Sequence, residues 1–145
     1  MNSFEYKSTV TIGDTNVMKN MYFLNFFKLQ GIARELWVKS PVDGGVEDLA
    51  QGMLLITKDA HCDFIKDFYL YDDIIVKLTF SRKANTNATI CFSFYHADTN
   101  ELHAKGYQTI VFADHEHKII KMPPNWKAAI ESFLVELSEV QVDPA

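Results

Sequence analysis

The chain has 145 residues, of which 48% are hydrophobic and 13% aromatic, and it carries a net charge of −5. This composition is typical of one folded globular domain and excludes a disordered chain. The acidic balance argues against nucleic acid as the main partner, because contacts to phosphates need a cationic surface. No apolar run approaches the roughly 20 residues that cross a bilayer, and the first ten residues lack a secretory signal. We therefore expect one cytoplasmic domain, residues 1–145, with Cys62 and Cys91 reduced.

The first 50 residues predict a strand, a turn, a long helix and a loop. Residues 4–12 alternate between two faces, which is typical of a strand with one side in solvent. Residues 13–20 are rich in Gly, Asp and Asn and predict a turn. Residues 21–39 predict one helix that ends at the Ser-Pro pair 40–41, because the residue before a proline disfavours the α conformation. Residues 40–50 predict a loop with room for a short helical turn.

The predicted helix is apolar nearly all round. At 100° per residue its charged side chains fall on one narrow stripe: Lys28, Glu35 and Lys39. Aromatic side chains fall on the opposite side: Phe23, Phe27 and Trp37. A helix of this kind is buried. Gln30 and Arg34 fall among the aromatic residues, and a buried guanidinium is costly unless it is paired and hydrogen-bonded. Arg34 is therefore a candidate functional residue, together with Asn16 in the preceding turn.

Four strands and a second helix are predicted in the remainder of the chain. The strands are residues 52–64, 74–83, 88–97 and 102–113. Short connectors between the last three favour antiparallel hairpins. A Pro-Pro pair leads into a helix at about 124–138 with apolar residues at helical spacing. This order predicts an α+β domain in which an antiparallel sheet wraps around one long central helix, with a C-terminal helix.

One stretch of the chain is similar to a known family. Residues 13–37 read GDTNVMKNMYFLNFFKLQGIARELW, and residues 104–109 read AKGYQT. Over residues 4–124 the chain resembles the hotdog-fold thioesterases of the 4-hydroxybenzoyl-CoA thioesterase type, whose pattern is roughly D-x-D-x-x-G-x-V-x-[FY]-x-x-[YF]. Asp14 and Asn16 take its two acidic positions. A Thr-Asn turn before the helix and an Arg-Glu pair late in it are most similar to the thioesterases of enediyne polyketide pathways.

The chain departs from this family pattern at three positions. Asn16 stands where most of the family has a catalytic Asp, and Lys19 replaces the glycine of the turn. Phe26 replaces a tyrosine that is frequent in the enediyne group. Because a carboxamide cannot act as a general base at neutral pH, these departures argue against the usual carboxylate-base mechanism.

Thioester hydrolysis and the resemblance together define a candidate site. Backbone N–H groups near Met21 and Tyr22, at the predicted helix start, would stabilise the tetrahedral oxyanion. Asn16 would bind the substrate carbonyl or the attacking water, with a turn or cap role as the alternative. Arg34 would hold a carboxylate or stabilise developing negative charge, with a structural ion pair as the alternative. The residues expected to bind substrate are Tyr22, Phe23, Asn25, Phe26 and Gln30.

Two other patterns are interpreted as structural. The Asp-His-Glu-His run at 114–117 lies in a predicted turn and lacks converging ligands, so we expect no metal and no cofactor. His61 and Cys62 are neighbours in a strand and face opposite ways, so we expect no nucleophilic pair.

The expected function is hydrolysis of an acyl or polyketide thioester on the phosphopantetheine of an acyl carrier protein, rather than on coenzyme A. The resemblance implies a homodimer or homotetramer with sites at the subunit boundary, which would also cover a sheet edge. Two alternatives remain. One is an acyl-CoA thioesterase of general metabolism, and the other is a non-catalytic hotdog protein that binds an acyl chain or scaffolds a partner.

Overall fold

The computed structural model describes residues 2–135, in which five strands form one sheet. Its strands, in spatial order, are β1 (Phe4–Thr9), β3 (Asp73–Lys83), β4 (Asn87–His96), β5 (Leu102–Ala113) and β2 (Leu54–Phe64). Each strand pairs antiparallel with its neighbours in this order. β1 and β2 are therefore the two edge strands of the described sheet.

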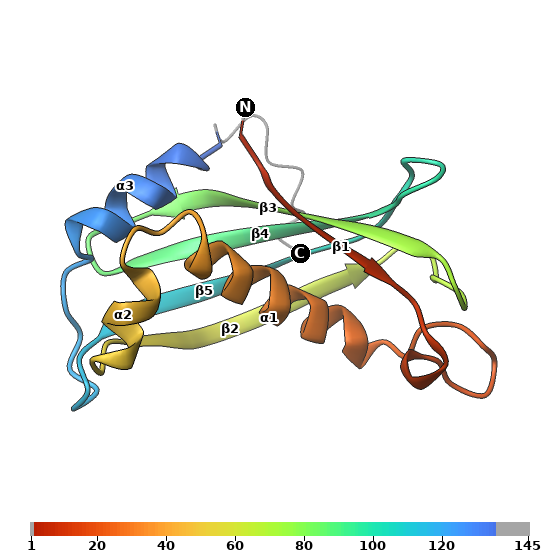
Figure 1. The fold of residues 1–145 in the computed structure, drawn as a ribbon, viewed down its shortest axis with the longest axis horizontal. Helices are drawn as coiled ribbons and strands as arrows, with labels where there is room; N and C mark the ends of the chain where they lie inside the picture. The colour runs from red at the N-terminus through yellow and green to blue at the C-terminus, as the bar shows by residue number, and fades with distance from the viewer. Residues whose placement is uncertain (1, 136–145) are drawn as a thin grey trace.

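The long helix α1 (Leu24–Lys39) lies across one face of this sheet (Figure 1). Its charged stripe is exposed, as predicted. The opposite side of the helix is buried, and Ala33 and Trp37 have no exposed surface. This amphipathic division fixes the rotation of α1 about its axis, so that Gln30 and Arg34 face the sheet.

Alternate residues of the central strands form the face that packs against α1, because successive strand side chains point to opposite sides. Its large apolar members are all buried: Val76, Leu78, Phe80, Ile90, Phe92, Phe94, Ile110 and Phe112. Phe26 contacts Phe94 with ring centroids 5.3 Å apart, and Trp37 contacts Phe80 at 4.8 Å. Burying each such side chain contributes about 1.5–3 kcal/mol, so both halves of α1 are firmly held on the sheet.

Two short helices cover the end of the sheet where α1 ends (Figure 1). They are α2 (Gly45–Ala50) and α3 (Pro124–Ser132). The carboxylate of Asp48 accepts hydrogen bonds from Trp126 Nε1 at 2.8 Å and from Asn125 Nδ2 at 2.9 Å. Asp48 thus joins α2 to α3 and satisfies the indole N–H of a fully buried tryptophan.

The first strand is shorter than predicted. It ends at Thr9 rather than at residue 12. The carboxylate of Asp14 accepts hydrogen bonds from the backbone N–H and the hydroxyl of Thr11, at 2.9 and 3.0 Å. These bonds close a 3₁₀ turn over Ile12–Asp14, so Asp14 has the turn role that competes with extended structure.

The C-terminal helix is also shorter than the predicted 124–138. It ends at Ser132, and the next residues pair with the sheet, since the N–H of Val135 donates to the carbonyl of Phe80 at 2.8 Å. Residues 136–138 of the predicted helix lie outside the described residues. In the part of the chain that the structure describes, no helix is long and apolar enough to span a membrane.

Both cysteines are buried free thiols, as predicted. Burial, with a smaller contribution from the charge of Asp63, raises the pKa of Cys62 to about 12. A thiol with this pKa stays neutral at physiological pH and is a poor nucleophile.

Candidate functional site

The turn before α1 positions Asn16 at the surface. Its Oδ1 accepts a hydrogen bond from the N–H of Met18 at 2.9 Å, and its backbone carbonyl accepts one from the N–H of Lys19 at 2.9 Å. This is an Asx turn, so the side-chain oxygen has the structural role that the sequence left as an alternative. The Nδ2 group has no acceptor among the described residues and is available to a ligand carbonyl or to water.

The backbone N–H groups available at the helix start differ from those predicted. The N–H of Met21 donates to the carbonyl of Phe68 at 2.7 Å, and the N–H of Tyr22 donates to that of Asp14 at 2.8 Å. These long-range bonds delay α1 to Leu24, three residues later than predicted. Among residues 2–135, the N–H groups of Phe23 and Leu24 have no acceptor, so they are the donors that the helix start leaves open.

Apolar side chains are exposed around this helix start. Phe23, predicted on the buried side of the helix, is 50% exposed, because it precedes the first helical turn. Tyr22 packs edge-to-face on Phe23 with centroids 5.0 Å apart, and Phe23 packs on Phe64 at the end of β2 at 6.1 Å. Val17 and Met18 are also exposed. We call the exposed residues Val17, Met18, Tyr22, Phe23, Leu24 and Phe64 the aromatic patch, in which the three rings are in contact; large exposed apolar patches mark interaction sites.

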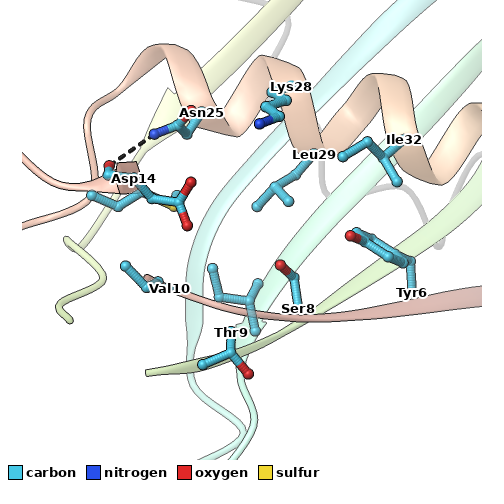
Figure 2. Close-up of a pocket in the computed structure, with 11 residues that line it drawn as sticks. Tyr6, Ser8, Thr9, Val10, Asp14, Asn25, Lys28, Leu29 and Ile32 are labelled. Atoms are coloured by element: carbon cyan, nitrogen blue, oxygen red, sulfur yellow. Dashed lines mark hydrogen bonds between the residues drawn. The ribbon is translucent and has the colours of Figure 1, made fainter. Parts of the chain in front are cut away.

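Asn25 braces the turn and borders a small crevice between β1 and α1 (Figure 2). Its Nδ2 donates to the carbonyl of Asp14 at 2.8 Å. Tyr6, Ser8 and Lys28 line the same crevice, whose volume is about 190 Å³. Binding pockets for small organic molecules are usually about 300–1,000 Å³, so this crevice is too small for a long acyl chain.

Phe26 and Gln30 lie in the interior. Phe26 is 2% exposed and Gln30 has no exposed surface, so neither side chain is at the surface of the single chain. Their contact with substrate stays a prediction. Phe26 packs between Phe64, Phe68 and Phe94. Phe26 therefore packs behind Phe64, a member of the aromatic patch.

Arg34 is a largely buried cation held by neutral groups. Its Nη1 donates to the hydroxyl of Thr57 at 2.6 Å and to Oε1 of Gln108 at 3.0 Å, and its Nη2 donates to the carbonyl of Leu55 at 3.0 Å. Within residues 2–135 no carboxylate pairs with it. Burial lowers the pKa of Arg34, yet a guanidinium remains charged at neutral pH. The structural ion pair that the sequence left open is therefore not formed within the described chain.

An apolar groove of about 730 Å³ opens beside Arg34, between α1, α2 and the start of β2. Its apolar wall includes Leu36, Val46, Leu49, Met53 and Leu55. Glu35 and Lys39 border it on the exposed side of α1. The volume lies within the range of pockets that hold small organic molecules, and the groove places one permanent cation against an apolar wall.

Asn16 and Arg34 are not brought together within one chain. Asn16 precedes the first residue of α1 by eight positions, and Arg34 lies ten residues after that first residue. At 1.5 Å per residue the helix from its start to Arg34 is about 15 Å long. One chain therefore holds two halves of the predicted polar site at different places along α1.

Two further sequence patterns are structural here. His61 Nε2 lies 3.0 Å from the Asp63 carboxylate on the face of the sheet away from α1, while Cys62 is part of the core, so the two side chains point to opposite sides of the sheet. The Asp-His-Glu-His run forms a turn in which Asp114 caps the backbone N–H groups of Glu116 and Lys118. No cluster of three or more metal-ligating side chains occurs among the described residues.

Sequence reasoning missed the partners of Arg34. Thr57 lies in no recognised motif. Gln108 is part of the AKGYQT stretch that resembles the family, but it is 74 residues away from Arg34 in the chain, and nothing in that stretch pairs it with an arginine. Gly106 offered a signal, because a glycine inside a strand commonly marks a close approach of another group. A Cβ added at Gly106 would lie 2.6 Å from Nε2 of Gln30.

The description "Thioesterase-like superfamily" belongs to the family model that matches residues 10–130 of the chain. No curated protein matches it in sequence. Among solved structures, the dynemicin thioesterase, described with a bound polyene, has a TM-score of 0.87 and 24% identity, covering 92% of this chain and 99% of its own.

Two other solved structures bring coenzyme A into the comparison. A 1,4-dihydroxy-2-naphthoyl-CoA thioesterase from Synechocystis has a TM-score of 0.80 and 23% identity, covering 89% of this chain and 96% of its own. The Staphylococcus aureus protein SAV2348, solved with CoA, has a TM-score of 0.84 and 13% identity, covering 99% of this chain and 89% of its own. Together with the sheet and helix described above, these similarities confirm the predicted hotdog fold.

Proposed function

Because the chain belongs to the thioesterase-like superfamily, we propose that it hydrolyses an acyl or polyketide thioester carried on phosphopantetheine. The observation that carries the proposal is Arg34, a buried cation without an acidic partner in residues 2–135, beside an apolar groove of about 730 Å³. A largely buried charge without a counter-ion favours an anion that approaches it. A thioester substrate supplies one as its carbonyl oxygen gains negative charge.

The proposed chemistry follows from the groups left available. Arg34 and the free N–H groups of Phe23 and Leu24 stabilise the oxyanion of the tetrahedral intermediate. The Nδ2 group of Asn16 orients the substrate carbonyl or the attacking water. Asn16 cannot take a proton from water at neutral pH, so hydrogen bonding and the local positive field activate the water. The proposal requires no metal and no cofactor.

The acyl chain lies in the apolar groove beside α1 in this proposal. Tyr22 and Phe23 are exposed at the helix start and contact the substrate directly in this proposal. Phe26 and Gln30 are buried and support the residues that contact the substrate. Asn25 holds the turn that carries Asn16. The groove is open along the exposed side of α1, so it admits an extended chain.

Two copies of the chain are needed to complete this site. Asn16 precedes α1, and Arg34 lies about 15 Å along the helix from its start. A two-fold pairing in which the helix start of one copy lies against the middle of the other helix would bring the two groups together. The aromatic patch and the edge strand β2 supply surface that such pairing would bury. We therefore propose a homodimer, or a homotetramer built from it, with sites at the subunit boundary.

We propose that an acyl carrier protein presents the thioester to this chain. The chain would then act in the cytoplasm as an enzyme of a polyketide pathway. The Thr-Asn turn and the Arg-Glu pair support it, as does similarity to the dynemicin thioesterase. The similarity to a naphthoyl-CoA thioesterase and to a CoA complex favours the second candidate, an acyl-CoA thioesterase. The absence of a carboxylate at position 16 favours the third, a non-catalytic acyl-binding protein.

The test compares hydrolysis of octanoyl-CoA with hydrolysis of the octanoyl thioester of an acyl carrier protein. We expect turnover of both, with the larger kcat/KM on the carrier protein. Arg34→Ala should lower kcat about 10²–10³-fold, as loss of an oxyanion donor does, and Asn16→Ala about 10-fold or more. A preference for coenzyme A would support the second candidate, and no turnover of either would support the third. Full activity in both variants would show that the site lies elsewhere.

A further inference from the structure

The hydrogen bonds to Arg34 fix its direction without reducing its charge. All three acceptors are neutral: a hydroxyl, an amide oxygen and a backbone carbonyl. A carboxylate in the same place would have neutralised the guanidinium. Thr57 and Leu55 belong to the edge strand β2, whereas Gln108 belongs to β5 inside the sheet. Gln108 is therefore the contact that ties the guanidinium to the interior.

Gln108 is itself held by a second buried glutamine. Its Nε2 donates to Oε1 of Gln30 at 3.0 Å, and Nε2 of Gln30 donates to the carbonyl oxygen of His61 at 3.1 Å. Gln108 is 6% exposed and Gln30 has no exposed surface. Buried amides in a fully paired chain of this kind are costly to disturb, because a reoriented member leaves unpaired groups in the interior.

The direction of this amide chain is determined at both ends. The His61 carbonyl can only accept, so Gln30 must present its NH₂ group there and its oxygen to Gln108. Gln108 must then present its NH₂ group to Gln30 and its oxygen to Arg34, which can only donate. Neither amide can be rotated by 180° without placing two donors or two acceptors face to face. The two linked amides therefore hold Oε1 of Gln108, the acceptor for Arg34, in one fixed position.

We infer that Gln108 is a positioning residue for Arg34, acting with Gln30 as a buried amide relay anchored on the His61 carbonyl. The inference rests on the proposed function, since the positioned guanidinium is the one proposed to meet the oxyanion. Gln108 touches no substrate and acts only through Arg34. The relay fixes the orientation of the Arg34 guanidinium and leaves its positive charge uncompensated. The guanidinium is thereby pre-organised to stabilise the negative charge that develops on the substrate carbonyl oxygen.

The test is a double-mutant cycle on octanoyl-thioester hydrolysis with Gln108→Met, Arg34→Ala and the double variant. We expect Gln108→Met to lower kcat about 10-fold or more with KM within about threefold, and the double variant to be no slower than Arg34→Ala alone. If the two single losses multiply in the double variant, or if Gln108→Met keeps full kcat, the positioning role is wrong while the proposed function stands. The control Gln51→Met removes an exposed glutamine outside the groove and should leave kcat unchanged.

A second measurement follows the guanidinium without catalysis. The chain has two arginines, Arg34 and Arg82, so the two side-chain Nε–H signals in a ¹⁵N NMR spectrum are assigned by the Arg34→Ala variant. A slowly exchanging Arg34 signal should be present in the wild type and broaden in Gln108→Met, with Arg82 unchanged. An unchanged Arg34 signal overturns the inference. If Arg34→Ala retains full activity while the Arg34 signal broadens in Gln108→Met, the proposed role of Arg34 in hydrolysis is wrong. The positioning of Arg34 by Gln108 is then still supported.

The variant Gln108→Glu has the same shape and serves as a second variant beside Gln108→Met. Its carboxylate accepts from Arg34 and neutralises it, but it cannot donate to Oε1 of Gln30 as Gln108 does. The Arg34 signal should therefore persist while kcat falls about 10-fold or more. Full kcat in Gln108→Glu would contradict the claim that the relay preserves an uncompensated charge.

Discussion

Gly106 of β5 lies so close to Gln30 of α1 that a Cβ at position 106 would stand 2.6 Å from the Gln30 amide nitrogen, and it would also overlap the carbonyl oxygen of His61. The missing side chain is what lets the Gln30 amide reach across β5 to β2. One glycine thereby brings the helix and two strands together at a single buried point.

The first prediction is that Gly106→Ala lowers the free energy of unfolding by about 3 kcal/mol, at or above the upper end for overpacked sites. The added carbon meets backbone on one side and a paired amide on the other, so neither can yield cheaply. Urea unfolding measures the loss. Gly31→Ala is the matched control: nothing lies within 4 Å of its added Cβ, and alanine in a helix should raise stability by up to about 1 kcal/mol. Equal effects at the two positions would contradict the close packing at Gly106.

The second prediction concerns Lys19, which has a φ of 66° where the family pattern has glycine. A lysine in the left-handed region is strained, and glycine adopts this conformation at no steric cost. Lys19→Gly should therefore raise the free energy of unfolding by about 0.5–1 kcal/mol, after the larger chain entropy of unfolded glycine is subtracted.

Thermal unfolding measures this change, and Lys127→Gly in the exposed part of α3 is the control. Glycine there should lower stability by about 1 kcal/mol, because the backbone is helical. A Lys19→Gly variant that is destabilised like the control would show that the turn does not strain its lysine.

The third prediction is a loss of stability at alkaline pH through Cys62, whose pKa is raised from 9.0 to about 12 by burial and by Asp63. The sign follows from proton binding. Above pH 9 the unfolded thiol loses its proton while the folded thiol keeps it, so the unfolded state is favoured as pH rises. The contribution is fully present below pH 9 and is lost between pH 9 and about 12.

Cys62→Ala removes this dependence. At pH 10 the wild type should have lost about 1 kcal/mol more of its neutral-pH stability than the variant has lost. Urea unfolding at pH 7 and pH 10 gives the comparison, with all other titrating groups common to both proteins. Parallel losses in the two proteins would show that the folded thiol ionises normally.

Local patterns predicted the strands and the end of α1 better than its start. Residues 102–113 were predicted with the observed boundaries, since their alternation and connectors are local signals. The helix ends at Lys39 beside Pro41, again a local effect. Its start was placed at 21 rather than 24, because the N–H groups of Met21 and Tyr22 are bound by carbonyls at positions 68 and 14. Such partners are chosen by the tertiary fold.

The candidate site shows the same division. The burial of Arg34 followed from its place on the helix. The acceptors that hold it come from β2 and β5, and the sequence next to Arg34 does not identify them. That Asn16 and Arg34 lie at different places could have been predicted from the sequence. Asn16 precedes the helix, and the ten residues from the helix start to Arg34 span about 15 Å.

The two edge strands of the described sheet differ in length, since β2 has 11 residues and β1 has six. Past the end of β1, the N–H of Val135 bonds to the carbonyl of Phe80 in the neighbouring strand β3. If two copies pair through their β2 strands, the longer edge strand of each copy is covered and only the shorter strand β1 stays open. In the proposed dimer the remaining outer edges would be the short strands β1, which are poorer templates for adding a further strand and so would disfavour growth into a fibre.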